Sequence, residues 1–298
     1  MQGHLELAEK KPPGVSQSRQ RRIIMTPYLP TLRQFIKTGK IKKPIAIGAR
    51  LKKCPQIHTM GFKPNFSDYS PGEQKQLFQA PKVYYPTAFY ADLFNTMGKK
   101  TFPSYHTYKF AQDKIKQTAL FQMLDLPHPR TKVFYGPRQK KCILKEFDFP
   151  FIAKIPRGSA RGIGVYLIQT SGDLSTYLNR RGPAYIQEYL PIDRDMRVIV
   201  IGRQIVLGFW RIAGKNSFKT NLSQGGKISF DPLPKRALAL ALLTAEKCGW
   251  NDVGIDIIQS GNRLYVLEGN MKYGTKGFQK AGIDYRELLC SLILNNRV

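Results

Sequence analysis

The sequence predicts an α/β protein of the α+β kind, built from antiparallel hairpins and amphipathic helices. Two apolar runs around a Ser-Gly-Asn turn are typical of a β-hairpin over Val253–Asn270. A second pair of runs, over Met196–Ala213, meets at a Gly-Arg turn. Helical apolar spacing follows in Pro232–Cys248 and Tyr285–Leu294. A chain of 298 residues is long enough for one large domain or two to three small ones.

The N-terminal third is expected to hold a basic leader followed by a small α/β domain. Residues 1–22 are polar, contain Pro and Gly and end in Arg-Gln-Arg-Arg, which favours a disordered leader. Residues 23–108 combine short apolar runs with one helical pattern, which favours a small α/β domain. The expected elements are strands at 44–48 and 82–86, a helix over Ala88–Met97 and a loop over Cys54–Gly72.

The rest of the chain alternates strands and helices more clearly, and we divide it into subdomains at 109–183 and 184–298. Proline at 127 and 129 ends the first helix of this part, because proline cannot continue a helix. The further expected elements are a helix over Gln112–Asp125, strands over Thr131–Tyr135, Phe151–Ile155 and Val165–Gln169, a helix over Asp173–Arg180 and a strand over Ala184–Leu190.

The charge of the chain is strongly positive. Forty-eight Lys and Arg against twenty Asp and Glu give a net charge of +28, a field that attracts polyanions. Residues 1–60 alone hold thirteen basic and two acidic residues, a net of +11. This favours an acidic partner, such as nucleic acid, the ribosome, an acidic peptide or a phosphorylated small molecule. The alternative is a solvated basic surface with no such partner.

The location is expected to be cytoplasmic, without membrane association. No apolar run approaches the ~18 residues of a membrane span, and the first residues lack the apolar run of a signal peptide. The four cysteines are far apart and form no Cys-x-x-Cys pair, so we expect reduced thiols. The four histidines are scattered as well, a pattern that does not indicate a zinc site.

A candidate metal site lies in the last predicted hairpin. Asp256 interrupts its first strand, and Glu268 and Asn270 end its second strand two residues apart, on one face. The turn would bring all three together. Two carboxylates and a carboxamide are hard oxygen ligands, of the kind that Mg²⁺ takes together with water and phosphate oxygens. The alternative is an edge hairpin whose acidic residues face solvent.

A candidate phosphate site lies between two strands at 151–165. Three glycines, Gly158, Gly162 and Gly164, free the backbone to approach a ligand. Lys154 would supply a charge for a phosphate, and Ser159 a hydroxyl donor. No Lys-Ser/Thr pair follows the last glycine, so this is not a Walker loop. A glycine-rich cover over a triphosphate is one interpretation, and an ordinary glycine-bearing hairpin is the other.

Three weaker candidates follow in order. The segment Gln187–Leu190 ends a strand and could offer backbone groups to adenine and a carboxylate to ribose. Arg197 and Arg211 fall on successive strands, and arginine suits bidentate contacts to carboxylate or phosphate. Lys219 and Asn221 stand shortly before a Gly-Gly pair. Each of these could equally be an ordinary strand end or surface charge.

Taken in order, these motifs resemble the ATP-grasp enzymes, and most closely the RimK-type alpha-L-glutamate ligases. The resemblance covers about residues 109–285. It implies an ATP-grasp fold in which two α+β subdomains clasp ATP, preceded by a small N-terminal α/β domain. It departs from the family after Asn270, where Met271-Lys272-Tyr273-Gly274 replaces the usual small residue, Pro and Gly.

The resemblance also implies roles for individual residues. Lys154 and Arg211 would be catalytic, Arg211 steadying an acyl phosphate, and Arg197 with Arg211 would contact substrate. Two Mg²⁺ or Mn²⁺ ions would be held by Asp256, Glu268 and Asn270. The expected ATP-binding residues are Lys114, Lys154, Gly158, Ser159, Arg161, Gly162, Ile163, Gly164, Gln187, Glu188, Tyr189, Leu190, Asp195, Lys219 and Asn221.

The expected function is that of an ATP-dependent carboxylate–amine ligase. It would add glutamate or another amino acid to an acidic small-molecule, peptide or protein acceptor, through an acyl phosphate. Ribosome or nucleic-acid association through the basic surface, and a homo-oligomer, are also expected. One alternative is a kinase of a polyanionic small molecule on the same scaffold. The other is a non-catalytic RNA- or ribosome-binding protein.

Overall fold

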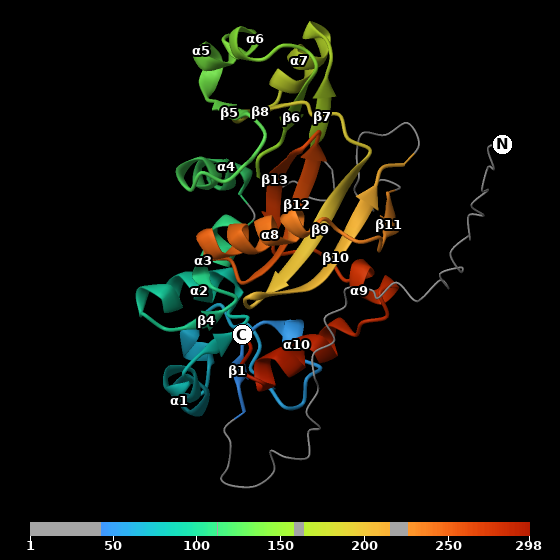
Figure 1. The fold of residues 1–298 in the computed structure, drawn as a ribbon. Helices are drawn as coiled ribbons and strands as arrows, with labels where there is room; N and C mark the ends of the chain where they lie inside the picture. The colour runs from blue at the N-terminus through green and yellow to red at the C-terminus, as the bar shows by residue number, and fades with distance from the viewer. Residues whose placement is uncertain (1–42, 112, 158–163, 215–225) are drawn as a thin grey trace, which may run out of the picture.

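Three β-sheets follow one another along the molecule, each with its own helices (Figure 1). The computed structural model describes residues 43–111, 113–157, 164–214 and 226–298. The N-terminal sheet and the first antiparallel sheet lie at opposite ends, and the second antiparallel sheet lies between them. The chain therefore brings its last strands into contact with both of its earlier parts.

The N-terminal sheet is parallel, with strand order β2-β1-β3-β4. Its strands are two residues long, and their side chains are mostly buried between helices, as is usual for parallel sheets. The chain passes from β1 to β2 on one side and then to β3 on the other side of β1. The elements are β1 (Ile45–Ala46), η2 (Ala49–Leu51), β2 (His58–Thr59), η3 (Phe66–Asp68), α1 (Pro71–Gln79), β3 (Val83–Tyr84), α2 (Thr87–Thr96), β4 (Thr101–Phe102) and α3 (Tyr105–Phe110).

The first antiparallel sheet has the order β5-β8-β6-β7. Its core is rich in aromatic side chains, among them Phe134, Phe147 and Phe151, which are almost fully buried. Helix α7 begins at a capping box, in which Thr170 and Asp173 each accept a hydrogen bond from the other's backbone N–H. The elements are α4 (Lys114–Met123), β5 (Thr131–Phe134), α5 (Gly136–Lys140), α6 (Ile143–Glu146), β6 (Phe151–Lys154), β7 (Val165–Ile168), α7 (Ser171–Leu178) and β8 (Ala184–Glu188).

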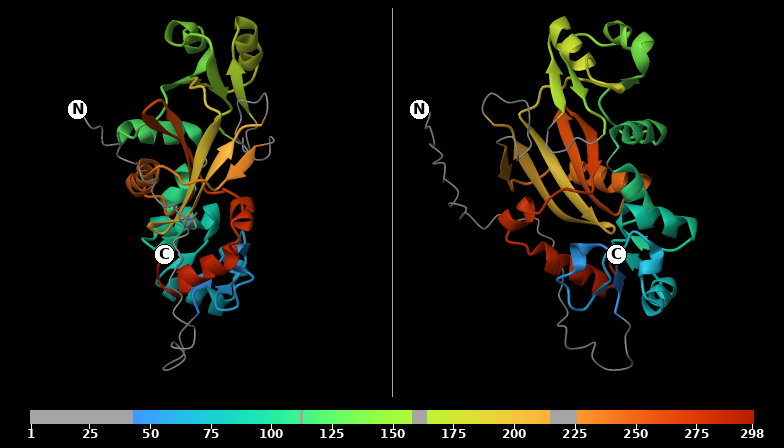
Figure 2. Two further views of the ribbon diagram at one scale, coloured as in Figure 1. Left: turned by 45° about the vertical axis from the view of Figure 1, so that its right-hand side comes forward. Right: turned by 180° about the vertical axis from the view of Figure 1, so that it is seen from behind.

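The second antiparallel sheet has the order β11-β10-β9-β12-β13. Helix α8 packs on one face through small residues, Ala237, Ala241 and Ala245, which let the helix approach the sheet closely. On the opposite face α9 and α10 contact the sheet and the N-terminal domain, as the views in Figure 2 agree. The elements are β9 (Arg194–Ile201), β10 (Gln204–Ile212), β11 (Lys227–Ser229), α8 (Lys235–Lys247), β12 (Asp252–Ser260), β13 (Arg263–Asn270), α9 (Lys276–Lys280) and α10 (Tyr285–Leu294).

Side chains along β9 point alternately to the two faces of the sheet, and this decides which of them lie at the candidate site. Met196, Val198 and Val200 face α8, whereas Ile199 and Ile201 belong to the core on the opposite face. Asp195 and Arg197 have the same parity as Ile199 and therefore lie on that opposite face. The polar end of this face becomes the candidate site described below.

The predicted hairpins and the last helix are confirmed, with α10 at the predicted bounds. The prediction of a loop over Cys54–Gly72 is wrong in part. This stretch contains β2 and η3, and its end enters α1. Strand β2 exists because His58 and Thr59 pair with β1, a contact between distant residues that composition does not reveal.

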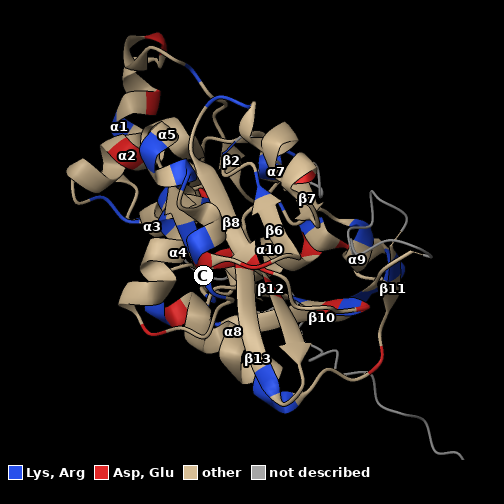
Figure 3. Cartoon of the chain, turned by 90° about the horizontal axis from the view of Figure 1, so that it is seen from above, with Lys and Arg blue, Asp and Glu red and all other residues tan. Residues whose placement is uncertain are grey.

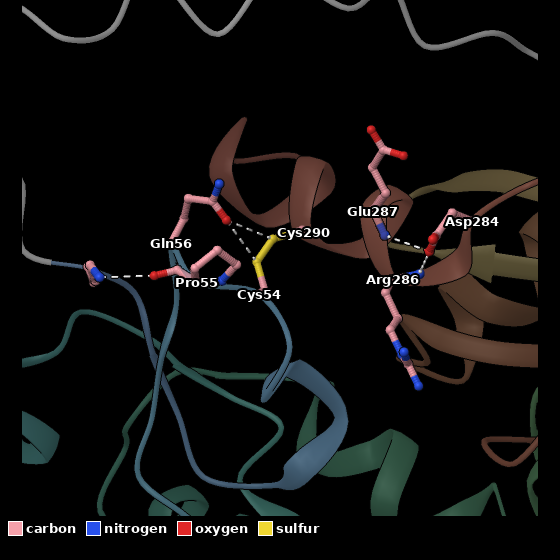
Figure 4. Close-up of a disulfide and its surroundings, with 8 residues drawn as sticks. Cys54, Pro55, Gln56, Asp284, Arg286, Glu287 and Cys290 are labelled. Atoms are coloured by element: carbon pink, nitrogen blue, oxygen red, sulfur yellow. Dashed lines mark hydrogen bonds between the residues drawn. A yellow bond between two sulfur atoms is a disulfide. The ribbon is translucent and has the colours of Figure 1, made fainter.

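Two cysteines form a disulfide, which corrects the prediction of four reduced thiols. Cys54 follows η2 and Cys290 lies in α10, and their Cα atoms are 6.3 Å apart (Figure 4). The amide oxygen of Gln56 lies near both sulfur atoms. Cys142 and Cys248 are free. The two bonded residues are 236 positions apart, so only the packing of α10 on the N-terminal domain brings them together.

Basic residues lie on most of the described elements and outnumber acidic ones (Figure 3). The positive charge is therefore not confined to the first residues of the chain. Within the described ranges, every helix is too short or too polar to span a bilayer.

Candidate active site

The three candidate metal ligands lie together at one end of the β12–β13 hairpin. Asp256 is directly opposite Glu268, and Gly254 is opposite Asn270. The pairing register shifts after Asp256, which is a local irregularity of the kind often found near functional sites. The Asn270 amide Nδ2 donates a hydrogen bond of 2.6 Å to Glu268 Oε1. Three oxygen-bearing side chains thus converge where the sequence predicted.

Two arginines from β9 and β10 hold Asp256. Arg197 lies opposite Asp256 in the β9–β12 pair and donates two hydrogen bonds of 2.7 Å to its carboxylate. Arg211 donates two bonds of 2.6 Å to Asp195, and its Nη2 lies 2.8 Å from Asp256 Oδ2. Asp195, Asp256 and Arg211 are almost fully buried. This is a bidentate network of two cations and two anions, which fixes the position of Asp256.

Two lysines from the preceding subdomain face Glu268. The ammonium Nζ of Lys114, the first residue of α4, lies 3.0 Å from Glu268 Oε2. Lys154 ends β6 and is buried. Burial and the nearby Lys114 lower the pKa of Lys154 to about 8, although Glu268 and Asp256 oppose the shift. Burial alone would raise the pKa of Glu268, but Lys114 and Lys154 bring it down to about 2.

Helix α4 joins the two antiparallel sheets. The buried side chain of Gln117 exchanges two hydrogen bonds with the backbone of Gly269, at 2.9 and 2.8 Å. Gly269 lies between Glu268 and Asn270, so Gln117 holds the strand that carries both. At the next residue, the hydroxyls of Thr118 and of Tyr185 in β8 are 2.7 Å apart. Sequence reasoning missed Gln117, and an unusual glutamine within an apolar helix face was the only available signal.

Replacing Gln117 by leucine should destabilise the fold measurably. The change keeps the volume but leaves the buried Gly269 N–H and C=O without their partner. We expect the free energy of unfolding to fall by about 2–4 kcal/mol, measured by chemical denaturation. Gln122→Leu on the exposed side of the same helix is the matched control, with a change within about 0.5 kcal/mol. Equal stability of the two variants would contradict the role given to Gln117.

The predicted adenine segment lies at the end of β8. Gln187 is buried and donates a hydrogen bond of 2.8 Å to Thr131 Oγ1. The Glu188 carboxylate accepts a bond of 2.6 Å from the backbone N–H of Arg130, so one of its oxygens is already engaged. Leu190 follows the strand, and Tyr189 lines a cavity of about 990 Å³ together with Trp210.

Gly164, the last residue of the glycine segment, lies between β6 and β7. Strands β6 and β7 are antiparallel, with Lys154 opposite Val165, which agrees with the predicted pair of strands. Gly164 has a φ of +78°, and its carbonyl accepts a hydrogen bond of 2.7 Å from Ile155 N–H. A left-handed φ at this position favours glycine. The predicted residues outside the described ranges are Gly158, Ser159, Arg161, Gly162, Ile163, Lys219 and Asn221.

The donor set fits a hard cation that is completed by phosphate. Within the described ranges, no three His, Cys, Asp or Glu side chains gather closely enough to hold a metal by themselves. Asp256, Glu268 and Asn270 supply two carboxylates and one amide instead. Mg²⁺ is commonly bound by one or two carboxylates together with waters and substrate phosphates. The adjacent lysines are suited to those phosphates.

A second polar cluster, which the sequence did not reveal, lies at the start of β12. Asp252 is fully buried and accepts hydrogen bonds from Tyr273 at 2.5 Å, Tyr85 at 3.0 Å and Arg50 at 3.2 Å. Arg50 also donates to the hydroxyl of Tyr285. Burial raises the pKa of Asp252, and Arg50 and the two tyrosine hydroxyls oppose this. The cluster fastens the N-terminal domain to the second antiparallel sheet.

Comparison with known proteins decides the family. Residues 111–293, more than half of the chain, match the model described as RimK-like ATP-grasp domain. The chain belongs to the RimK-like ATP-grasp family. The predicted resemblance is thereby confirmed.

This RimK-like protein is similar to a curated bacterial protein and to a solved ATP-grasp structure. It is 27% identical over 194 residues to a protein of Vibrio atlanticus named "Probable alpha-L-glutamate ligase", covering 62% of this chain and 64% of that one. The chain therefore matches slightly less than two thirds of that relative's length. The crystal structure of a RimK domain ATP-grasp protein from Sphaerobacter thermophilus has a TM-score of 0.62 at 15% identity, covering 83% of this chain and 98% of that one.

A third comparison is with the ATP-grasp ligase PsnB, in its complex with a phosphomimetic variant of its minimal precursor, Mg and ADP. The TM-score is 0.64 at 16% identity, covering 86% of this chain and 99% of that one. At such identities the two structures support the fold alone. The predicted ATP-grasp fold, with an N-terminal parallel sheet and two antiparallel sheets, is confirmed.

Proposed function

We propose that this RimK-like protein is an ATP- and Mg²⁺-dependent carboxylate–amine ligase that adds glutamate or another amino acid to an acidic peptide, protein or small-molecule acceptor. The observation that carries the proposal is the meeting of Lys114 and Lys154 with Glu268 and Asp256 where the two antiparallel sheets join. The two lysines that would bind phosphate and the two carboxylates that would bind a metal thus come from opposite sides of one site. The family membership supports the same reaction.

In the proposed reaction, the acceptor carboxylate attacks the γ-phosphorus of ATP, forming an acyl phosphate and ADP. The amine then attacks the acyl carbon, phosphate leaves and an amide bond remains. Lys114 and Lys154 neutralise phosphate charge and hold the triphosphate in line with the carboxylate. Asp256, Glu268 and Asn270 would hold two Mg²⁺ or Mn²⁺ ions, which supply charge neutralisation at the transferred phosphate.

Arg211 has one group left for a substrate. Its Nε and Nη2 are bound to Asp195 and Asp256, and its Nη1 has no partner among the described residues. We assign this Nη1 to the acyl phosphate. Arg197 is more fully engaged, with Nε and Nη2 on Asp256 and Nη1 on the carbonyl of Tyr273. Its proposed part is therefore to position Asp256 and the segment after Asn270.

The net charge and the relatives support the proposed acceptor class. A net charge of +28 favours an acidic acceptor. The curated relative is named "Probable alpha-L-glutamate ligase", and PsnB has also been solved in complex with a precursor peptide. These observations favour glutamate as the amino acid and a peptide or protein as the acceptor.

The test is ADP release that depends on both substrates. Purified protein is incubated with ATP, Mg²⁺, pooled amino acids and cell extract, and the products are identified by mass spectrometry. We expect an acceptor whose mass increases by one or more amino-acid residues, with stoichiometric ADP. A phosphate ester without amide formation would instead establish a kinase. Absence of any ATP turnover would contradict the proposed function.

The pH dependence of the activity should follow the protonation of the buried Lys154. The pKa of Lys154 lies near 8, so the free protein loses this charge above that pH. We expect kcat/KM for ATP to fall above pH 8, by up to about tenfold per pH unit. The decline in kcat should begin at a higher pH, because bound phosphate favours the protonated lysine.

Arginine at the same position provides the control for this profile. Lys154→Arg keeps its charge throughout the range and should remove the decline between pH 8 and 10 in whatever activity it retains. Lys145→Arg, at an exposed position of α6, should leave the profile of the wild type unchanged. A decline that persists in Lys154→Arg would assign the titration to another group.

A further inference from the structure

Tyr185 is a buried tyrosine that faces the candidate active site and takes no part in the reaction proposed above. It lies in β8, directly opposite Lys154 in the β6–β8 pair, and is 2% exposed. Its neighbours in the strand, Ala184 and Ile186, belong to the aromatic core on the other face of the sheet. By alternation, the side chains of Tyr185 and Lys154 therefore share the face that meets helix α4.

The ring of Tyr185 lies beside the ammonium group of Lys154. Lys154 Nζ is 5.8 Å from the ring centroid, which is within the range of a cation–π contact. Such a contact is stronger for a cation that has lost its water, and Lys154 is buried. The carboxylates of Glu268 and Asp256 pair instead with Lys114 and with two arginines. The aromatic ring therefore helps to hold the Lys154 ammonium in place.

A second tyrosine fixes the backbone at the same pair of residues. The hydroxyl of Tyr177, in α7, donates a hydrogen bond of 2.7 Å to the carbonyl of Lys154. The same hydroxyl accepts a hydrogen bond of 3.1 Å from the N–H of Tyr185. All three residues are buried. The backbones of Lys154 and Tyr185 are thus held in register, and the contact between their side chains has a fixed base.

The hydroxyl of Tyr185 reaches helix α4. It lies 2.7 Å from Thr118 Oγ1, and this hydrogen bond is buried. Thr118 follows Lys114 by four residues in α4, so the two side chains lie on one face of the helix, about one turn apart. Lys114 is the lysine whose ammonium lies 3.0 Å from Glu268. One tyrosine thus contacts Lys154 with its ring and the helix face of Lys114 with its hydroxyl.

The start of α4 has another side-chain link to the end of β6. The Asp113 carboxylate, which caps the helix, accepts a hydrogen bond of 2.9 Å from Arg157. The side chain of Arg157 is 62% exposed, and exposed ion pairs contribute little and are screened by salt. The buried bond between Thr118 and Tyr185 is therefore the firmer of these two links between α4 and the β6–β8 pair.

We propose that Tyr185 is a positioning residue that sets the spacing of Lys114 and Lys154, the two lysines assigned to the triphosphate. The inference rests on the proposed function and adds to it the residue that holds both lysines at one separation. The lysines lie on separate elements, α4 and β6, so a side chain that contacts both elements fixes their spacing. A misplacement of about 1 Å in groups that position a substrate can cost 10²-fold in rate.

The first test removes the hydroxyl of Tyr185 and keeps its ring. Tyr185→Phe should raise the Kd of a non-hydrolysable ATP analogue with Mg²⁺ about tenfold, because the buried bond to Thr118 is lost. Calorimetric titration of the full-length protein measures this Kd. The Kd of AMP should stay unchanged, because AMP lacks the two outer phosphates. Equal losses for the analogue and AMP would show a merely structural role and overturn the inference.

Two further variants make this test specific. Thr118→Val removes the same hydrogen bond from its other end and should raise the Kd of the analogue by a similar factor. The double variant should bind no more weakly than either single variant, since both remove one interaction. Tyr166→Phe in β7 of the same sheet is the matched control, because its hydroxyl has no hydrogen-bond partner among the described residues. Additive losses, or a Tyr185→Phe variant with the Kd of the wild type, would overturn the inference.

The second test removes the ring and follows the charge of Lys154. Without the ring, the buried ammonium is less stabilised, so the affinity of Tyr185→Leu for the analogue should begin to fall about 0.5–1 pH unit lower than that of the wild type. Tyr185→Phe keeps the ring and should show the fall at the pH of the wild type. A fall at this same pH in Tyr185→Leu would contradict the contact between ring and ammonium.

No other group should produce this shift in pH. The charged groups that act on Lys154 are Glu268, Lys114 and Asp256, and none of the variants changes them. Burial, together with the nearby Glu268, raises the pKa of Tyr185 to about 12, so its phenol stays protonated over the range of the titration.

Nucleotide binding needs no acceptor, so these measurements are independent of the ligase reaction. A wild type that binds the analogue and shows the expected losses, yet forms no amide, would support the inference and contradict the proposed function. Amide formation together with a Tyr185→Phe variant that binds the analogue as the wild type does would give the reverse result. A wild type that binds no analogue at all would contradict both.

Discussion

Glutamine in place of Glu268 is expected to lower the rate of ADP release by about 10³-fold or more, since even one lost electrostatic contact to the transition state costs 10²–10³. The substitution keeps the shape of the side chain but removes the anion that faces Lys114 and Lys154. It also removes one of the two carboxylates proposed to bind Mg²⁺. The measurement is coupled-assay turnover at saturating ATP over a range of Mg²⁺ concentrations.

The same variant should alter the acid stability of the fold. The pKa of Glu268 is about 2 in the folded protein, below the ordinary 4.5. A depressed pKa contributes stability that is complete above the unfolded value and is lost as pH falls from about 4.5 towards 2. Glu268→Gln should therefore lose less stability over this window than the wild type does, as measured by denaturation at each pH.

Glu246→Gln is the control for both measurements. Glu246 is exposed on α8, away from the lysines, so its replacement should change neither turnover nor the acid profile. A Glu268→Gln variant with the turnover of this control would show that the hairpin carboxylates are not the metal site.

Methionine in place of Arg211 should lower the free energy of unfolding by about 3–5 kcal/mol, the usual cost of breaking a buried ion pair. Arg211 is 3% exposed and binds two buried carboxylates, those of Asp195 and Asp256. Without the guanidinium, buried Asp195 loses the two hydrogen bonds that Arg211 donates, whereas Asp256 keeps the two from Arg197. Chemical denaturation at neutral pH measures the loss.

Two further variants make this prediction specific. Arg194→Met removes an exposed arginine from the same strand pair, where the partner Asp193 is also exposed, and should cost at most about 1 kcal/mol. Asp195→Asn in the Arg211→Met background should restore part of the stability by removing one buried charge. A loss in Arg211→Met no larger than that in Arg194→Met would contradict the buried network.

Local patterns in the sequence determined the elements and the order of the site motifs. The alternation in 253–270 predicts a hairpin, and its turn fixes the register as far as Ile257 opposite Val266. The irregularity that follows, which the sequence did not reveal, places Asp256 opposite Glu268 and not opposite Leu267. The helical spacing of apolar residues in 285–294 predicted α10, because this pattern involves only neighbouring residues. Such features depend on the backbone over a few positions, so one sequence reveals them.

Only the tertiary structure decided which distant residues share an environment. Gln117 meets Gly269 across 152 positions, Arg50 meets Asp252 across 202, and Cys54 bonds Cys290 across 236. None of these pairs has a local pattern, because each depends on how separately formed elements pack. The same holds for charge: Arg197 and Arg211 look like surface residues in the sequence. Packing of β9 between β10 and β12 makes Arg211 the buried partner of Asp195 and Asp256, and half-buried Arg197 a second partner of Asp256.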